Sequence, residues 1–191
     1  MTATFKKIRK AAILIIIASL FLQHSVLAQD AVLQNIIVTN TRDDLLVYLS
    51  VEGAFREKMI KAIFSGVPTS FSFFIELYQV RNLWPDKKLA DIKITHTIKY
   101  DNLKKEFTVI RSWNEDKPVT TQSFLEARKL MSDVDGINVV PLKLLEKGRR
   151  YQIQAKAQLS KLTLPFYLHY VLFFVSLWDF ETDWYSIDFI Y

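Results

Sequence analysis

Apolar and polar residues alternate along several long segments of this chain, and this period of two is the pattern that most restricts its fold. In RYQIQAKAQL, residues 150–159, every second residue from Tyr151 to Leu159 is apolar, with glutamine or lysine between them. DIKITHTIKY, residues 91–100, has a similar pattern. Successive side chains of a strand point to opposite faces, so such segments place one face in a core and the other toward water. The alternation therefore predicts a mostly β fold.

Further segments indicate antiparallel pairs of strands. Residues 33–40 and 44–52 are joined by an Asn-Thr-Arg-Asp sequence with the composition of a turn, so they are expected to pair. Residues 91–113 are expected to form a β-hairpin around the turn DNLK. TSFSFFIELYQV, residues 69–80, carries aromatic residues on both of its faces. This predicts a central strand that is covered on both sides.

Two short amphipathic helices are expected between the strands. Residues 54–66 place one apolar stripe at helical spacing, formed by Phe55, Met59, Ile60, Ile63 and Phe64. Ser123 and Glu126 form a capping-box pattern that begins a second helix, which runs to about Ser132. The predicted fold is α+β: sandwich-like antiparallel sheets with two helices, in a single domain over residues 29–191.

The first 28 residues are typical of a secretory signal peptide, which would form an N-terminal signal helix. Lys6, Lys7, Arg9 and Lys10 precede an apolar run over residues 11–22, and Ala28 ends a cleavage-site pattern. The run is shorter than the about 20 apolar residues of a membrane span. A cleaved signal is therefore favoured over an uncleaved anchor, and the absence of a following cysteine excludes a lipoprotein. We expect export to the periplasm or cell envelope, a possible protein partner there, and membrane attachment only if the signal is uncleaved.

Charge and cysteine content exclude several classes of protein. The chain has 25 basic and 20 acidic residues, but residues 1–28 contain four of the basic ones and no acidic ones. The remainder, 21 against 20, shows no clustered basic stretch, so no nucleic-acid partner is expected. With no cysteine and with His96 and His169 as the only histidines after residue 28, neither a disulfide nor a zinc site of usual composition is expected. No cofactor is predicted.

The C-terminal segment 164–191 holds eleven of the 26 aromatic residues. Residues 164–177 are too short for a membrane helix and are expected to form a buried strand. From Trp178 to Trp184, aromatic residues alternate with Asp179, Glu181 and Asp183, which predicts an edge strand with its aromatics in the core. The three carboxylates are interpreted as a solvated strand face rather than as a calcium site.

Few residues are candidates for chemistry. His96, on the apolar face of its predicted strand, has no partner at ligand spacing, so a packing role is favoured over a base or a ligand; the same holds for His169. Glu76 lies on the second face of the central strand and, if buried, would need a partner such as Arg81 or Arg111. Residues 133–136, DVDG, resemble a fragment of a calcium loop but are interpreted as a helix end followed by a turn.

The order of these segments resembles a known family. An amphipathic helix precedes IFSGVPTSFSFFIELYQVRNLW and ITHTIKYDNLKKEFTV; then follow FLEARKLM, LLEKGRRYQIQAKAQLSKLTLPF and WDFETDWY. Over about residues 31–191 the chain resembles the bacterial family known as domain of unknown function 4390. The resemblance implies an exported protein of Gram-negative bacteria, with no established activity and no assigned catalytic residues.

Three functions are compatible with these patterns. The first is a non-enzymatic envelope protein that binds another protein or acts as an accessory factor. The second is a binder or carrier of apolar ligands in an aromatic-lined groove, which requires a cavity of roughly 300 Å³ or more. The third is a hydrolase whose site would bring His96 and Glu76 together. The candidate ligand or partner surface comprises Trp84, Trp113, Trp178, Trp184 and His96, and no catalytic or metal-binding residue is assigned.

Overall fold

The prediction of a mostly β, sandwich-like fold with two helices is confirmed. The computed structural model describes residues 31–113, 117–159 and 180–191. Its strands are β1 (Val32–Asn40), β2 (Asp44–Glu52), β3 (Thr69–Gln79), β4 (Lys87–Asp101), β5 (Glu106–Arg111), β6 (Val119–Thr121), β7 (Asp133–Pro141), β8 (Arg150–Leu159) and β9 (Tyr185–Ile190). Its helices are α2 (Glu57–Phe64), α3 (Phe124–Ser132) and the 3-10 turn η1 (Leu142–Leu144).

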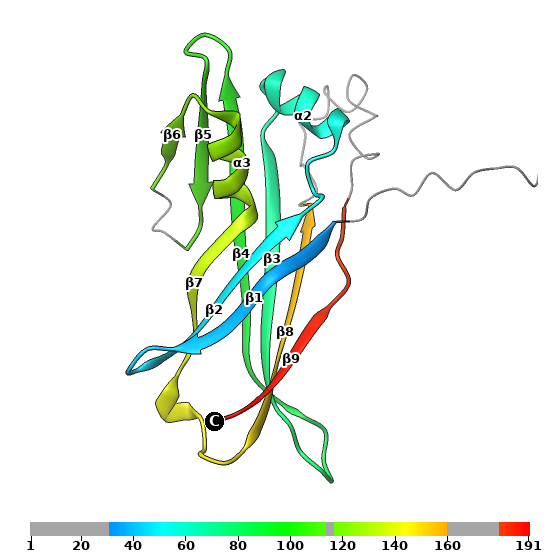
Figure 1. Cartoon of the computed structure of the whole chain (residues 1–191), viewed down its shortest axis with the longest axis vertical. Coiled ribbons are helices and arrows are strands. Elements are labelled where there is room, and N and C mark those ends of the chain that lie inside the picture. Colours follow the sequence, from blue (N-terminus) through cyan, green and yellow to red (C-terminus); the bar gives the residue numbers. More distant parts are fainter. Residues whose placement is uncertain (1–30, 114–116, 160–179) are drawn as a thin grey trace, which may run out of the picture.

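The strands form two antiparallel sheets. A three-stranded sheet has the order β1-β2-β7, and a six-stranded sheet has the order β6-β5-β4-β3-β8-β9. The smaller sheet crosses the long strands of the larger one obliquely (Figure 1). The two predicted hairpins, β1–β2 and β4–β5, are present, and β3 lies inside the large sheet as expected of a central strand.

The core lies between the two sheets and is built from the alternating residues that the sequence pattern singled out. The inward residues of β3 are fully buried: Phe71, Phe73, Ile75 and Leu77. Val47, Leu49 and Val51 of β2 lie in the same core from the opposite layer. Each large apolar side chain buried in this way stabilises the fold by roughly 1.5–3 kcal/mol.

Helix α3 is held at its start by a polar cap. The Ser123 hydroxyl accepts a hydrogen bond from the Glu126 backbone N–H at 3.3 Å, as a capping box requires. The Glu126 carboxylate, however, accepts from the Thr121 hydroxyl at 2.6 Å, and that hydroxyl in turn accepts from the Ser123 N–H at 3.0 Å. The cap therefore also ties the helix to β6.

The prediction of a turn after α3 is wrong. The helix ends at Ser132 and β7 begins at Asp133, so the chain passes from helix to strand without a loop. Gly136 lies within β7 at a φ of +69°, beside a shift in register between β2 and β7. A Cβ at Gly136 would lie 2.9 Å from the Tyr48 hydroxyl, so glycine allows the strand to continue through this bulge.

The expected edge strand from Trp178 to Trp184 is displaced along the chain. Regular pairing begins at Tyr185, and between Phe180 and Tyr185 Glu181 forms an isolated bridge with Gln158. Phe180 is buried as expected, but Trp184 is 44% exposed, so its placement in the core is wrong. Thr182 pairs with the backbone of Ala157 through both its N–H and its hydroxyl, and the ladder is interrupted at Asp183 and Trp184 before it resumes at Tyr185.

Several expectations concern residues outside the described part of the chain. They are the signal segment 1–28, the buried strand over 164–177, His169, Trp178 and Asp179. Within the described residues, none of the helices combines the length and the apolar character needed to cross a bilayer.

Candidate functional site

The face of the six-stranded sheet that points away from the small sheet carries the most concentrated group of polar and aromatic side chains. We call it the outer face; it is formed by Phe74, Glu76 and Tyr78 of β3, Lys88, Asp91 and Lys93 of β4, and Gln152, Gln154 and Lys156 of β8. We expected β3 to be covered on both sides; on its outer face Ser72 is buried, but Phe74, Glu76 and Tyr78 are only half-buried, so this prediction holds for only one end of the strand. Long side chains of the neighbouring strands cover them instead of another layer of the described residues.

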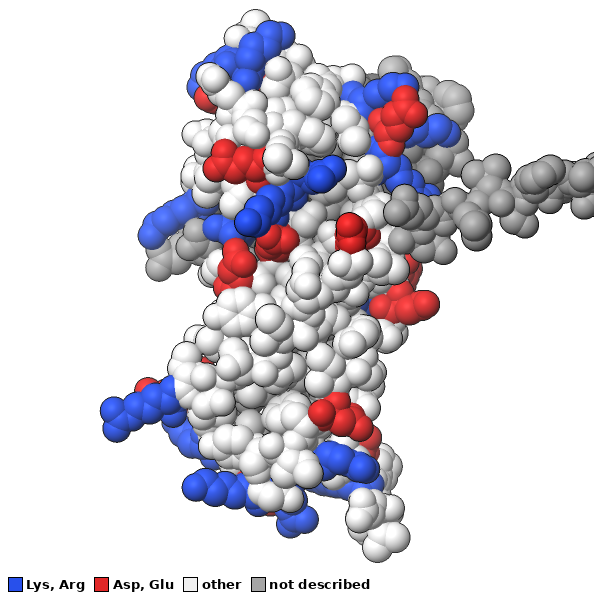
Figure 2. Space-filling view, viewed as in Figure 1, with Lys and Arg blue, Asp and Glu red and all other residues white. Residues whose placement is uncertain are grey.

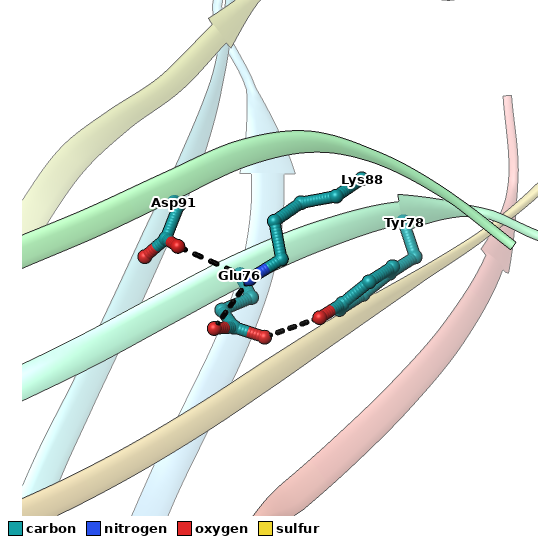
Figure 3. Close-up of polar contacts among 4 residues, drawn as sticks. All are labelled: Glu76, Tyr78, Lys88 and Asp91. Atoms are coloured by element: carbon teal, nitrogen blue, oxygen red, sulfur yellow. Dashed lines mark hydrogen bonds and ion pairs between the residues drawn. The ribbon is translucent and has the colours of Figure 1, made fainter.

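Glu76 organises one end of the outer face (Figure 3). One carboxylate oxygen accepts a hydrogen bond from the Tyr78 hydroxyl at 2.5 Å, and the other accepts from the Lys88 ammonium at 2.8 Å. Lys88 also lies 3.1 Å from an oxygen of Asp91. The Glu76 side chain is 16% exposed, which makes two donors necessary for its charge. The expected partners Arg81 and Arg111 do not bind it.

The charges in this Glu76 cluster fix its protonation states. The hydrogen bond to the Glu76 carboxylate, together with burial, raises the pKa of Tyr78. Hydrogen bonds to the carboxylates of Glu76 and Asp91 raise the pKa of Lys88, so its ammonium form is favoured. Neither group is thereby prepared to act as a base near neutral pH. The cluster is suited to holding a shape and a charge pattern rather than to proton transfer.

Aromatic rings and lysines alternate along the other end of the outer face. The Phe74 ring lies between the ammonium groups of Lys93 and Lys156, at 5.4 and 5.9 Å from its centroid. Lys156 also lies 5.2 Å from the Trp184 ring and forms an ion pair with Glu181. Such cation–π contacts order lysines over a sheet surface. The arrangement presents fixed positive charges beside aromatic rings.

His96 lies on the opposite, inward face and is fully buried. Its Nδ1 is 3.1 Å from the backbone oxygen of Met131, and its Nε2 accepts a hydrogen bond from the indole N–H of Trp113 at 3.0 Å. A carbonyl only accepts, so Nδ1 carries the proton and the imidazole is neutral. The ring also packs on Phe73, with centroids 4.9 Å apart. Both nitrogens are therefore occupied by structural partners.

The environment of His96 keeps it neutral. Burial lowers its pKa to about 4, and the charge of nearby Arg111 acts in the same direction against the effect of the Met131 carbonyl. Arg111 lies over the Trp113 ring at 4.8 Å and 3.5 Å from a carboxylate oxygen of Asp135. His96 and Glu76 lie on opposite faces of one sheet, so they do not converge in a cleft as the hydrolase hypothesis requires. The packing role favoured for His96 agrees with these contacts.

Comparison with known proteins identifies the family from the sequence. The family model for the domain of unknown function DUF4390 matches residues 28–188. The chain belongs to this family. No curated protein and no solved structure matches it.

The tryptophans selected from the sequence of this DUF4390 protein do not gather in one place within its described residues. Trp113 is joined to His96 by the hydrogen bond above, and Trp184 lies beside Lys156. Trp84 is 75% exposed in the connection between β3 and β4. Trp178 lies outside the described residues. Whether any of them contacts a ligand or a partner stays a prediction.

Hollows open to the surface at several places on the described part of this DUF4390 chain. One of about 760 Å³ separates the β1–β2 layer from α3 and is lined largely by polar residues such as Glu52, Arg128 and Lys129. Another of about 350 Å³ lies between residues 31–33 and 181–185. The third, of about 640 Å³, lies beside Trp84. These hollows are large enough for small ligands. Their walls are open and partly charged, however, so they suit apolar ligands less well than an enclosed apolar cavity would.

Among the described residues, no three histidine, aspartate or glutamate side chains come close enough together to hold a metal ion. Sequence reasoning missed the Lys–aromatic arrangement on the outer face. The signal for it was present in the β3 pattern, where Phe74 and Tyr78 occupy the face opposite the core. Its lysines became recognisable only once the register placed Lys93 and Lys156 on either side of Phe74.

Proposed function

We propose that this protein is a non-enzymatic binding factor of the cell envelope that engages a protein partner through the outer face. The observation that carries the proposal is the Phe74 ring held between Lys93 and Lys156 on a sheet face of half-buried aromatic and charged residues. Aromatic and cationic side chains that are already ordered lose little freedom when a partner binds. The site suits a partner surface with carboxylates and aromatic groups.

The neighbouring edge strand supports the same role. β9 is an edge strand of the large sheet among the described residues, and its Ser186 pairs with Gln154 of the outer face. A partner on the outer face would thus also reach this edge, where backbone groups are open to pairing. The export that the N-terminal sequence predicts would place this interaction in the periplasm.

Site-specific photo-crosslinking tests the proposal. A photoreactive residue at the exposed Ser186 is expected to give one adduct of defined mass in living cells, whereas the same residue at Leu125, exposed on α3, gives none. The substitutions Lys93→Glu and Phe74→Ala should abolish the adduct at Ser186. An adduct that survives both substitutions, or a monomer without any adduct at Ser186, would contradict the proposal.

A further inference from the structure

The connection between β3 and β4 projects two large apolar side chains into water. Leu83 is 91% exposed and its neighbour Trp84 is 75% exposed. The loop around them is closed by a hydrogen bond from the Arg81 backbone N–H to the Asp86 carboxylate at 2.9 Å. We call residues 81–86 the tip. Two adjacent exposed apolar residues of this size on a closed, projecting loop indicate a surface that binds another molecule or a membrane, which would remove them from water.

Basic residues from a distant segment surround the tip. The Val80 N–H donates to the backbone oxygen of Arg150 at 2.9 Å, which places the turn before β8 against the base of the β3–β4 hairpin. Arg81, Arg149 and Arg150 line the 640 Å³ groove beside Trp84. Lys and Arg side chains gather at this lower end of the molecule (Figure 2).

This concentration of charge is distinctive because the remainder of residues 29–191 has a net negative charge. Residues 79–87 and 142–150, which leave out the Lys88 of the outer face, together contain six lysines and arginines and two acidic residues. Residues 29–191 contain 21 basic and 20 acidic residues in all, which leaves 15 basic and 18 acidic outside these two segments. Sequence inspection finds no basic cluster because the fold, not the order of residues, brings the two segments together.

We infer that this end of the molecule docks on an anionic lipid surface, with Leu83 and Trp84 entering the headgroup region. Tryptophan prefers the membrane–water interface because its ring is apolar and its N–H is polar. Each lysine or arginine near an anionic bilayer strengthens binding by about fivefold. Binding at a membrane surface strengthens with both the buried apolar area and the attraction to anionic lipids, and the tip offers both. The docking goes beyond the proposed protein partner and uses a different surface.

The second hairpin end provides a matched control within the same chain. The β4–β5 turn also presents an asparagine followed by an exposed leucine, Asn102 and Leu103, with Lys104 and Lys105 next to them. It has no tryptophan. β4 runs the length of the large sheet between the two ends, so the turn and the tip are far apart (Figure 1).

Because the chain has no cysteine, a single one reports on one position. The full chain with Asn82→Cys or Asn102→Cys carries an environment-sensitive fluorophore and is mixed with vesicles of phosphatidylcholine alone or with one third phosphatidylglycerol. A blue shift and protection from an aqueous quencher are expected at Asn82 with the anionic vesicles only. The label at Asn102 should not respond. Each fluorophore reports only on the loop that carries it. The comparison of the two labels is therefore valid whether or not residues 1–28 attach the protein to the vesicle.

Substitutions then test whether the apolar side chains of the tip enter the bilayer. With the label at Asn82, the pair Leu83→Ser and Trp84→Ser should weaken the response at least about tenfold, and Leu103→Ser should leave it unchanged. The inference is overturned if both labels respond equally, if phosphatidylcholine alone gives the full response, if Leu103→Ser acts like the tip pair, or if neither label responds. If a soluble polyanion produces as large a fluorescence response as the anionic vesicles, the surface binds nucleic acid or another polyanion, and the inference is also overturned.

Discussion

The two faces of the six-stranded sheet show how one strand can serve both structure and recognition. Phe73 and Phe74 are adjacent in β3, yet Phe73 is fully buried against His96 while Phe74 lies half-buried between two lysines. On the inward face, polar groups are few and each described one has fixed partners. On the outer face, charged groups remain near water and are arranged by their neighbours.

This difference between the faces predicts which side chains can be substituted without loss of stability. The neutral His96 is locked by Met131 and Trp113, so any change of its charge must disturb the core. The Glu76 cluster is ionic and borders solvent, where water can replace a lost partner. We therefore expect mutations on the inward face to alter stability, and mutations on the outer face to alter binding.

The largest expected effect on stability is the difference between two single substitutions, each of which replaces one of the adjacent phenylalanines. Phe73→Ala should lower the free energy of unfolding by about 3–5 kcal/mol because it leaves a cavity beside His96. Phe74→Ala should lower it by about 1 kcal/mol, since its ring already contacts solvent and lysine side chains. Urea denaturation of both variants measures the difference. Equal losses would show that the outer face is packed as tightly as the core.

A pH effect of similar size is expected from His96. Above pH 6.5 the imidazole is neutral in both the folded and the unfolded chain, so it contributes no pH dependence. Between pH 6.5 and about 4 the unfolded chain takes up the proton and the folded chain does not, so stability falls as the pH is lowered. The loss over this window should be roughly 3 kcal/mol.

His96→Asn is the control for this pH effect. Asparagine keeps a donor for the Met131 carbonyl but does not titrate, so the variant should be less stable at pH 7 and its stability should depend less on pH between 6.5 and 4. Denaturation curves of both proteins across this range give the difference. The same pH dependence in both would mean that carboxylates, not His96, determine acid stability.

Trp113→Phe should have an intermediate effect. It retains a ring beneath Arg111 but removes the N–H that His96 Nε2 accepts from, leaving a buried acceptor unpaired. The expected loss is about 1–2 kcal/mol in thermal or urea unfolding. A neutral result would indicate that water reaches the histidine from this side.

The smallest expected effect lies in the Glu76 cluster. Glu76→Gln removes the carboxylate that raises the pKa of Tyr78, so that pKa should return toward its ordinary value, while stability changes by less than about 1 kcal/mol. Ultraviolet titration of tyrosine, with Tyr78→Phe subtracted, measures the shift. An unchanged pKa would mean that burial rather than Glu76 dominates.

The sequence was most informative where one face of a strand or helix meets the core. Alternation placed His96 among inward residues and paired β4 with β5, because burial of one face leaves few registers open. The serine cap likewise located the start of α3. In these places a local pattern and the tertiary environment require the same residue types.

Prediction failed where distant segments decide the structure. The strand β7 was hidden because its Gly136 had the signature of a turn, and only the bulge opposite Tyr48 makes glycine suitable within a strand. Trp184 was expected inside because it continued an alternation, but the register shifts between Thr182, which pairs with Ala157, and Tyr185, which pairs with Ala155, and Trp184 lies in this irregular stretch. The partner of Glu76 depended on a register that brings Lys88 beside it. No local window contains that information.

The direct passage from α3 into β7 has a mechanical consequence. Met131, hydrogen-bonded to His96 of the large sheet, lies only two residues before Asp133, which is aligned with Ser50 of the small sheet. The chain thus has no flexible linker where it crosses between the two sheets. If one sheet slid past the other, either the hydrogen bond between Met131 and His96 or the pairing of Asp133 with Ser50 would have to break. Spacer residues inserted after Ser132 would act as a hinge between the two layers at this crossing.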